Sequence, residues 1–231
     1  IDDVRTLSPR IRLLVEFVVS ILLTFKYIGI NLLSPVYIIA IVTLINAVNM
    51  MDGMDGICAS VSLISAVGLL FTVSSNYDKL LLFTLIGALF GYLIYNFPPA
   101  RIFMGDAGSY LIGGILSIAV LSSGRRGDYT VVSAIIFVSI FFFDLIAGFT
   151  RRILNGRSPF NGDRDHIYDK IQNRLQDSRK TLFVVIGIQL IIFLAGYISR
   201  QSAIMSVVSS LFVVIIYFFI GKVLGILKQD K

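Results

Sequence analysis

The sequence contains a single cysteine, Cys58, and no tryptophan. One cysteine excludes an internal disulfide bond. Charged residues are also scarce, at 15% of the chain, where an average soluble domain has roughly 25%. Hydrophobic residues instead make up 56%, and they recur in apolar runs of about 17–25 residues, the length that crosses a bilayer. The composition therefore predicts a membrane protein, in which 10 Tyr and 18 Phe supply the aromatic side chains of the bilayer interfaces.

The apolar runs predict an all-α fold, a polytopic transmembrane helix bundle with about eight spans. We expect these spans at Ile11–Ile28, Pro35–Met51, Ile57–Ser74, Leu80–Asn96, Ser109–Ser122, Tyr129–Phe149, Thr181–Ile198 and Ala203–Leu227. Residues 1–231 are expected to form one integral-membrane domain, with a basic loop at residues 150–180. In the short fifth span, Gly113 and Gly114 favour close packing against a neighbouring helix.

The distribution of basic residues predicts how the bundle is oriented in the membrane. An even number of spans places both chain ends on one side. Fifteen of the 20 Lys and Arg residues then fall on that side, eight of them between Arg151 and Lys180, and five fall on the other. The first side is predicted to be cytoplasmic, because basic loops stay inside. The net charge of +6 is explained in this way, and we expect no nucleic-acid partner.

The most unusual stretch is Asn46–Gly56, which reads N-A-V-N-M-M-D-G-M-D-G between two apolar runs. Asn46, Asn49, Asp52 and Asp55 are spaced by three residues, so on a helix they face roughly the same way. Two carboxylates at this spacing repel each other unless a cation or a proton lies between them. A turn with Asp55 as a helix cap is the simpler alternative, but a cap leaves both Asn residues unexplained. We interpret the stretch as a site for a cation and a phosphate group.

A second glycine-rich acidic turn, F-M-G-D-A-G-S at residues 103–109, is predicted to lie on the same side of the membrane. Glycines let the backbone approach a ligand, and a helix N-terminus presents free N–H groups to phosphate. Asp106 in this turn can hold a hard divalent cation that bridges phosphate oxygens. Simple capping of the helix by Asp106 or Ser109 is the alternative. The presence of the first stretch on the same side favours the ligand interpretation.

The long basic loop contributes G-R-S-P-F at residues 156–160 and D-R-D-H at residues 163–166. Arg157 and Arg164 can bind phosphate oxygens in a bidentate manner. His166 is the only histidine; a lone loop histidine is usually incidental, but this one lies among Arg and Asp residues on the predicted active face. The pair Asp2-Asp3 precedes the first span on that face, where solvated surface charge is the simpler alternative.

Together these residues predict a cytoplasmic-face site for Mg²⁺ and a polyphosphate, open sideways to lipid. The implied chemistry is phosphoryl transfer to or from a membrane lipid. Two other classes stay open. A cation transporter would place its acidic residues near the middle of the bilayer, whereas here they gather at one face. A CDP-alcohol phosphatidyltransferase would need a D-G-x-x-A-R run, and residues 55–60 read D-G-I-C-A-S.

The sequence resembles the polyprenyl-phosphate N-acetylhexosamine-1-phosphate transferases of glycosyl transferase family 4. The resemblance rests on the two glycine-rich motifs, on the opening D-D-V-R-T-L-S-P, and on G-R-S-P-F and D-R-D-H, in this order over nearly the whole chain. It is closest to the bacterial branch that starts cell-surface glycans such as O-antigen and teichoic acid. It implies transfer of a sugar-1-phosphate from a UDP-sugar, most commonly UDP-GlcNAc, to undecaprenyl phosphate, with release of UMP. It also implies a plasma (inner) membrane location and, as one assembly, a homodimer.

The resemblance assigns roles to the metal and lipid side of the site. It implies that Asp106 and Asn49 are ligands of Mg²⁺, with Mn²⁺ as an alternative. It implies that Asp2 and Asp3 lie near the lipid phosphate and the metal. The mechanism that we favour is a single displacement, in which a phosphate oxygen of the lipid attacks the β-phosphorus of the UDP-sugar. A covalent aspartyl-phosphate formed by Asp2, Asp3 or Asp52 is the competing route.

The resemblance also assigns roles on the nucleotide side. It implies that Asp52 and Asp55 are catalytic and nucleotide-side acids, that Phe103 stacks on uracil, and that His166 lies at the sugar-phosphate end. Two departures accompany it. Members of the family have more helices, so we expect their N-terminal helices to be absent from this chain, which begins without Met. The family's loop motif H-x-H-H is replaced by His-Ile-Tyr-Asp at residues 166–169.

Overall fold

A computed structural model of the chain describes residues 8–124, 128–158 and 165–227. Within these ranges it contains nine α-helices and no strand, which confirms the predicted all-α class. The helices are α1 (Pro9–Tyr27), α2 (Ser34–Met51), α3 (Ile57–Leu70), α4 (Asn76–Asn96), α5 (Gly105–Ser123), α6 (Asp128–Leu154), α7 (Ile167–Leu175), α8 (Ser178–Ser199) and α9 (Ala203–Leu224).

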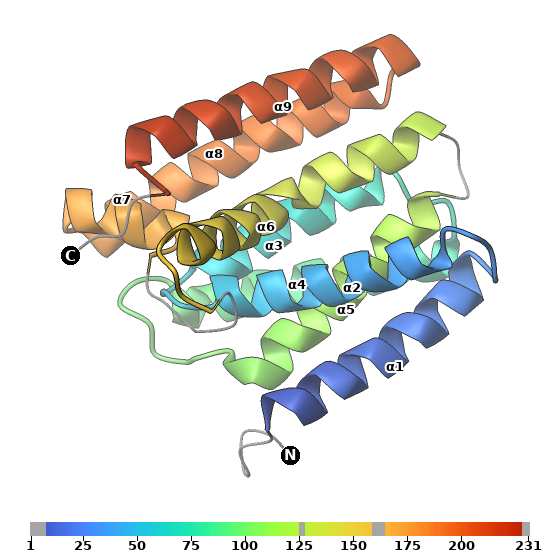
Figure 1. Cartoon of the computed structure of the whole chain (residues 1–231), viewed down its shortest axis with the longest axis horizontal. Coiled ribbons are helices and arrows are strands. Elements are labelled where there is room, and N and C mark those ends of the chain that lie inside the picture. The colour runs from blue at the N-terminus through green and yellow to red at the C-terminus, as the bar shows by residue number, and fades with distance from the viewer. Residues whose placement is uncertain (1–7, 125–127, 159–164, 228–231) are drawn as a thin grey trace.

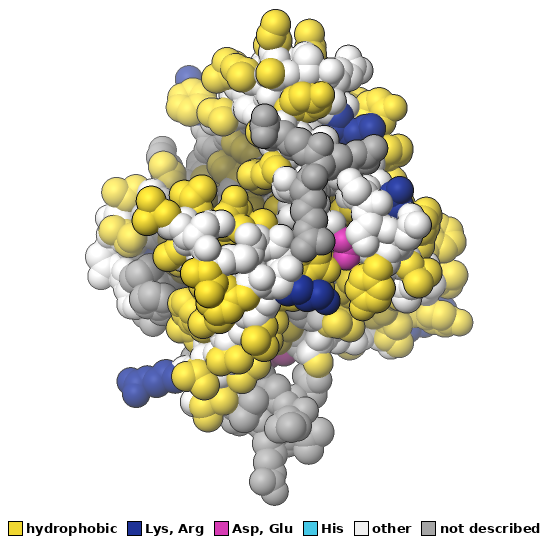
Figure 2. All heavy atoms as spheres, turned by 90° about the vertical axis from the view of Figure 1, so that its right-hand side faces the viewer, with side chains coloured by type: hydrophobic (Ala, Val, Ile, Leu, Met, Phe, Trp, Pro, Cys, Tyr) yellow, Lys and Arg dark blue, Asp and Glu magenta, His cyan; other side chains and the backbone are white. Residues whose placement is uncertain are grey.

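The eight long helices run up and down, so their ends collect at two ends of the bundle (Figure 1). End A carries both chain termini, the short helix α7 and the connections that follow α2, α4 and α6. End B carries the connections that follow α1, α3, α5 and α8. Figure 2 looks onto end B, where the Lys and Arg side chains in view are few and scattered among apolar ones. The two glycine-rich acidic turns of the sequence both lie at end A.

Helix α3 forms the centre of the bundle. It packs against α4, α8, α5 and α6, and apolar side chains along it, such as Ile57, Val61 and Leu69, are fully buried. The outer helices instead expose large apolar side chains, as on α9, where Phe218 is 74% exposed. Exposed apolar surface of this extent is expected where a helix faces lipid. The structure therefore has the inside and the outside of a membrane-embedded bundle.

Six of the described helices are long and apolar enough to cross a membrane: α2, α4, α5, α6, α8 and α9. The prediction of about eight spans is therefore slightly wrong. Each of the eight expected segments does correspond to a helix. However, α3 has only 14 residues, and α1 carries Arg10, Arg12, Glu16 and Lys26. With six candidate spans, the chain is a multi-pass membrane protein.

The basic loop expected at residues 150–180 is largely helical where the structure describes it. Helix α6 continues to Leu154, and α7 occupies Ile167–Leu175. The amphipathic pattern of α7 is too short to stand out in a sequence rich in charge. Asp177 then caps α8 by accepting hydrogen bonds from the amides of Arg179 and Lys180. These hydrogen bonds, the one from Lys180 first, lower the pKa of Asp177.

Candidate active site

The stretch Asn46–Gly56 forms the end of α2 and the turn into α3. Helix α2 ends at Met51, and the backbone amide of Asp52 donates to the carbonyl oxygen of Asn49 at 3.2 Å. The turn closes at Gly56, whose φ of 75° is in the left-handed region that favours glycine. Asn49 therefore projects from the last turn of a helix, while Asp52 follows directly after it.

A close approach of α5 to α2 brings the two acidic turns together. A Cβ atom on Gly113 of α5 would lie 2.8 Å from the Cα atom of Ile45 on α2, so only glycine permits this separation. About one helical turn towards end A, Asn49 Nδ2 donates to Ser109 Oγ at 2.8 Å and to Asp106 Oδ1 at 3.2 Å. The expected close packing is thus found at Gly113. It places the amide of one motif against the carboxylate of the other.

Helix α1 supplies an arginine to the same carboxylate. Arg12 Nη1 donates to Asp106 Oδ2 at 2.7 Å, with the side chains 27% and 39% exposed. One turn further along α1, the carboxylate of Glu16 accepts a hydrogen bond from Asn46 Nδ2. Asn46 and Asn49 therefore contact different helices, α1 and α5. The site so formed joins the consecutive helices α1 and α2 to α5. We call Asn49, Asp52, Asp106 and Arg12 the acidic cluster.

Asp52 is the second carboxylate of the acidic cluster. Burial, the larger cause, and the nearby negative charge of Asp106 together raise its pKa from the usual 3.8 to about 6. Both causes disfavour the ionised form, and a bound cation would relieve both. The two acids, which come from separate motifs, are thus close enough to interact electrostatically.

Asp55 faces a different neighbour, the connection between α4 and α5. Its Oδ2 accepts a hydrogen bond from the amide of Ala100 at 2.9 Å. Asn96, at the end of α4, accepts from the amide of Gly56 at 2.9 Å and donates to the carbonyl of Ile102 at 2.8 Å. Next to Ile102, Phe103 is 78% exposed. The connection is therefore held in place by its polar residues while its aromatic ring is presented to the exterior.

A polar hollow of about 410 Å³ lies beside Asp55. Its lining is completed by Pro98, Pro99, the α8 cap Asp177 and the first two residues of α8. Arg179 from α8 donates through Nε to the carbonyl oxygen of Pro98 at 3.0 Å, which joins α8 to the α4–α5 connection. The hollow thus combines two carboxylates, those of Asp55 and Asp177, with a guanidinium group at end A.

His166 lies at the start of α7, buried against α6. Its Nδ1 is 2.6 Å from Asp144 Oδ2, and Asp144 Oδ1 accepts from the amide of Ile167 at 2.8 Å. Asp169 accepts from the amide of His166 at 3.0 Å, which completes a capping box. Burial is the first cause of a raised pKa at Asp169. The histidine ring is therefore held in one orientation by two elements.

Tyr168 connects this histidine segment to the acidic turn. Its ring stacks on His166 at a centroid distance of 5.5 Å, and its hydroxyl donates to the carbonyl of Met50 at 3.2 Å. A Cβ atom on Gly53 would lie 2.1 Å from this hydroxyl, so the glycine of the turn leaves room for Tyr168. Burial raises the pKa of Tyr168, which keeps it a hydrogen-bond donor. The loop with His166 thus packs directly on the turn with Asp52.

The remaining expected site residues fall elsewhere. Arg157 is exposed beyond the end of α6, and its amide donates to the carbonyl of Arg152 at 2.9 Å. Asp2, Asp3 and Arg164 lie outside the described residues.

Sequence reasoning missed several members of the site. Arg12 lies within the first expected span, and its position in the sequence gives no sign that it contacts Asp106. Glu16, Asn96 and Asp144 were not included either, although each contacts a site residue or its support. Each is a polar residue inside or at the edge of an apolar run. That position alone marks an intramembrane polar residue as a functional candidate.

Among the residues that the structure describes, no group of three or more His, Cys, Asp or Glu side chains could hold a metal ion. The carboxylate of Asp106 and the amide carbonyl of Asn49 are hard oxygen ligands. Mg²⁺ usually takes only one or two carboxylates and completes its shell with water and substrate phosphate oxygens. The donor set of the acidic cluster therefore fits a cation that binds together with a polyphosphate, and not a site made by protein ligands alone.

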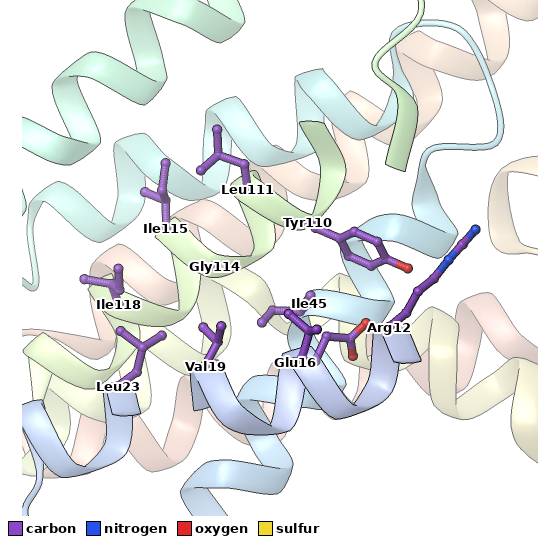
Figure 3. Close-up of a pocket in the computed structure, with 11 residues that line it drawn as sticks. Arg12, Glu16, Val19, Leu23, Ile45, Tyr110, Leu111, Gly114, Ile115 and Ile118 are labelled. Carbon is purple, nitrogen blue, oxygen red and sulfur yellow. The ribbon is translucent and has the colours of Figure 1, made fainter. Parts of the chain in front are cut away.

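An apolar groove of about 380 Å³ runs from the acidic cluster between α1 and α5 (Figure 3). Arg12, Glu16 and Tyr110 line its polar end, and aliphatic side chains line the rest as far as Leu23 and Ile118. The groove thus leads from charged groups at end A into the apolar part of the bundle.

Residues 1–124 match the family model of glycosyl transferase family 4. The fold and the site describe a multi-pass membrane protein with an acidic cluster at one end, and the sequence match defines its family. The chain belongs to glycosyl transferase family 4.

Curated relatives point to the same family. The chain is 29% identical over 147 residues, 62% of its length, to a probable undecaprenyl-phosphate N-acetylglucosaminyl 1-phosphate transferase of Bacillus subtilis. It is 34% identical over 110 residues, 45% of its length, to an undecaprenyl-phosphate alpha-N-acetylglucosaminyl 1-phosphate transferase of Haemophilus influenzae. It is 40% identical over 78 residues, 32% of its length, to a phospho-N-acetylmuramoyl-pentapeptide-transferase of Streptococcus pneumoniae. These alignments cover 41%, 31% and 23% of the three relatives, so the chain matches less than half of each.

Proposed function

We propose that this protein transfers a sugar-1-phosphate, most commonly GlcNAc-1-phosphate, from a UDP-sugar to undecaprenyl phosphate and releases UMP. The observation that carries the proposal is the acidic cluster, in which Asn49 and Asp106 meet at 3.2 Å at the end of a membrane bundle. Family membership and the names of the curated relatives support the same chemistry. The reaction would be the first membrane step of cell-surface glycan synthesis.

In this reaction an oxygen of the lipid phosphate forms a bond to the β-phosphorus of the UDP-sugar. The bond from that phosphorus to the bridging oxygen breaks, and UMP leaves with the electron pair. A phosphate monoester has its second pKa near ~6, so the attacking oxygen is already largely ionised at neutral pH. The protein therefore needs to position the two phosphates and to neutralise their charge, and it needs no strong base.

The described residues suit these tasks. Arg12 can hold Asp106 and a phosphate oxygen at the same time, because a guanidinium group has five N–H donors. Asp106 and Asn49 are proposed to hold Mg²⁺, which when bound would neutralise charge on the diphosphate. Phe103 presents an exposed ring on which uracil can stack. Asp55 lies beside the polar hollow on the same side, where we propose the nucleotide end.

The histidine segment is proposed to act on the sugar-phosphate end. His166 is held by Asp144, and Tyr168 attaches it to the turn that carries Asp52. Arg157 and Arg164 are proposed to contribute positive charge from the loop that follows α6. End A is proposed to face the cytoplasm, because most basic residues belong to it.

The direct test measures UMP release by the purified protein in detergent or nanodiscs. Release should require UDP-GlcNAc, undecaprenyl phosphate and a divalent cation, and it should stop with EDTA and resume with Mg²⁺ or Mn²⁺. A panel with UDP-GalNAc in place of UDP-GlcNAc would identify the donor. Absence of lipid-dependent UMP release with every donor would refute the proposal.

Two variants test the assignment of the acidic cluster. Asp106→Ala should lower turnover about a hundredfold or more, as expected when a preorganised charge-stabilising group is lost. Asn49→Ala should lower turnover as well, whereas Asn76→Ala should leave it unchanged, because Asn76 is exposed at end B. Near-normal turnover of Asp106→Ala would remove the metal assignment.

A further inference from the structure

One hydroxyl group near the acidic turn has no hydrogen-bond partner among the described residues. It belongs to Tyr92 on α4, and its oxygen atom is buried although the side chain as a whole is only partly so. A buried tyrosine hydroxyl usually has a partner, because leaving a donor unpaired away from water costs free energy. The position of this hydroxyl therefore needs an explanation beyond the packing of apolar surface.

Tyr92 lies on the face of α4 that packs on the core around α3. It precedes Asn96 by four residues, so the two side chains share one face of the helix. Asn96 accepts a hydrogen bond from the amide of Gly56 at 2.9 Å, which joins this part of α4 to the acidic turn. Tyr92 interacts electrostatically with Asp52 and, more weakly, with Asp55. Its hydroxyl is therefore close to the turn that carries both carboxylates.

The carboxylate of Asp52 lacks what the hydroxyl of Tyr92 could supply. Asp52 is partly buried, and no residue in the described part of the chain donates a hydrogen bond to its side chain. A donor without an acceptor thus lies near an acceptor without a donor. The two groups are beyond direct hydrogen-bond distance, and a polar contact across such a gap is commonly bridged by a water molecule.

We propose that Tyr92 is a positioning residue for Asp52, whose carboxylate it holds through one bridging water molecule. The hydroxyl donates to the water, and the water donates to the carboxylate. The inference rests on the proposed function, in which the acidic cluster that includes Asp52 positions the two phosphates, and it adds the residue that orients this carboxylate. Tyr92 acts through Asp52, because a misplaced group in the site lowers the rate even when the substrates still bind.

Tyr92→Phe removes the hydroxyl and keeps the aromatic ring. Tyr95→Phe is the matched control, because Tyr95 belongs to the same helix and is 53% exposed. If the hydroxyl of Tyr92 has no partner in the folded protein, its removal should leave Tm unchanged or raise it, since an unpaired buried group is lost. If the hydroxyl holds Asp52, its removal should lower Tm by about 1–6 °C.

The first experiment measures the kinetics of UMP release. Tyr92→Phe should lower kcat on the order of tenfold, as expected for the loss of one hydrogen bond to a charged group, and leave KM for UDP-GlcNAc and for undecaprenyl phosphate unchanged. Tyr95→Phe should match the unaltered protein in all three constants. In the Asp52→Ala background, Tyr92→Phe should lower the residual turnover no further. An unchanged kcat in Tyr92→Phe, or the same loss in both backgrounds, would overturn the proposal.

The second experiment needs no turnover. Tm is measured for Tyr92→Phe alone and in the Asp52→Ala background. The bridged hydrogen bond requires both side chains, so the loss of about 1–6 °C should appear in the first case and be absent in the second. An equal loss in both backgrounds, or no loss in either, would overturn the proposal. If the protein releases no UMP with any donor, the proposed function fails, and the melting curves alone decide whether Tyr92 holds Asp52.

Discussion

The packing of α2 against α5 should be most sensitive to an added carbon atom at the contact between Gly113 and Ile45. In Gly113→Ala the new Cβ atom would lie 2.8 Å from the Cα of Ile45 and 3.3 Å from its carbonyl oxygen. Both atoms belong to backbone, so no side chain can move aside. The two helices must separate by several tenths of an ångström at this point.

The neighbouring glycine isolates the cost of that separation. Gly113 and Gly114 both lie inside α5, so alanine at either position gains helix propensity worth about 1 kcal/mol. Only Gly113→Ala pays for overpacking, typically about 1–3 kcal/mol. The two alanine variants should therefore differ by about 1–3 kcal/mol, with Gly114→Ala the more stable. At roughly 2–4 °C per kcal/mol for a chain of this size, Tm should differ by about 2–12 °C.

The assay is thermal unfolding of the unaltered protein and the two alanine variants in the same detergent. Because the chain has no tryptophan, unfolding is followed by the loss of helix content. Separation of α2 from α5 should also pull Asn49 away from Asp106, so Gly113→Ala should lower turnover more than Gly114→Ala does. Equal Tm values and equal turnover for the two variants would show that α2 and α5 do not meet at Gly113, and the construction of the acidic cluster would be wrong.

Three further changes test other parts of end A. The folded protein holds the pKa of Asp52 at about 6, above the usual 3.8, so the free energy of unfolding should fall as pH rises from about 4 to above 6. Asp52→Asn should remove this loss. A pH series of melting curves should show that the variant gains more in Tm at pH 7.5 than at pH 5. Asp144→Asn should lower kcat and shift the pH profile of turnover, because it weakens the contact that orients His166. If Asp144 is only structural, the variant should have a lower Tm while the pH profile of its remaining activity stays unchanged. Gly53→Ala should displace the Tyr168 hydroxyl, which lies 2.1 Å from the added carbon, and should speed hydrogen exchange in α7; unchanged exchange there would contradict the packing of α7 on the acidic turn.

Local patterns were enough to predict the eight long helices, although not the short helix α7. Apolar runs of bilayer length predict each long helix, because burying or embedding that surface is the dominant free-energy term whatever the neighbours are. The span count was less accurate because length and charge decide whether a helix can cross a bilayer. Helix α3 is short and is packed inside protein, and no local pattern says which apolar run becomes the centre.

The sequence by itself also identified the acidic and amide residues of the two glycine-rich turns as site candidates, since polar groups at the edge of apolar runs need partners. It did not say which partners they have. Only the tertiary structure joined Asp106 to Arg12 and Asn49, from three different helices, and turned Asp55 towards the α4–α5 connection instead. The physical reason is that these contacts depend on how closely the helices approach. That approach is decided by packing at points such as Gly113, which lies more than a turn away from the residues it brings together.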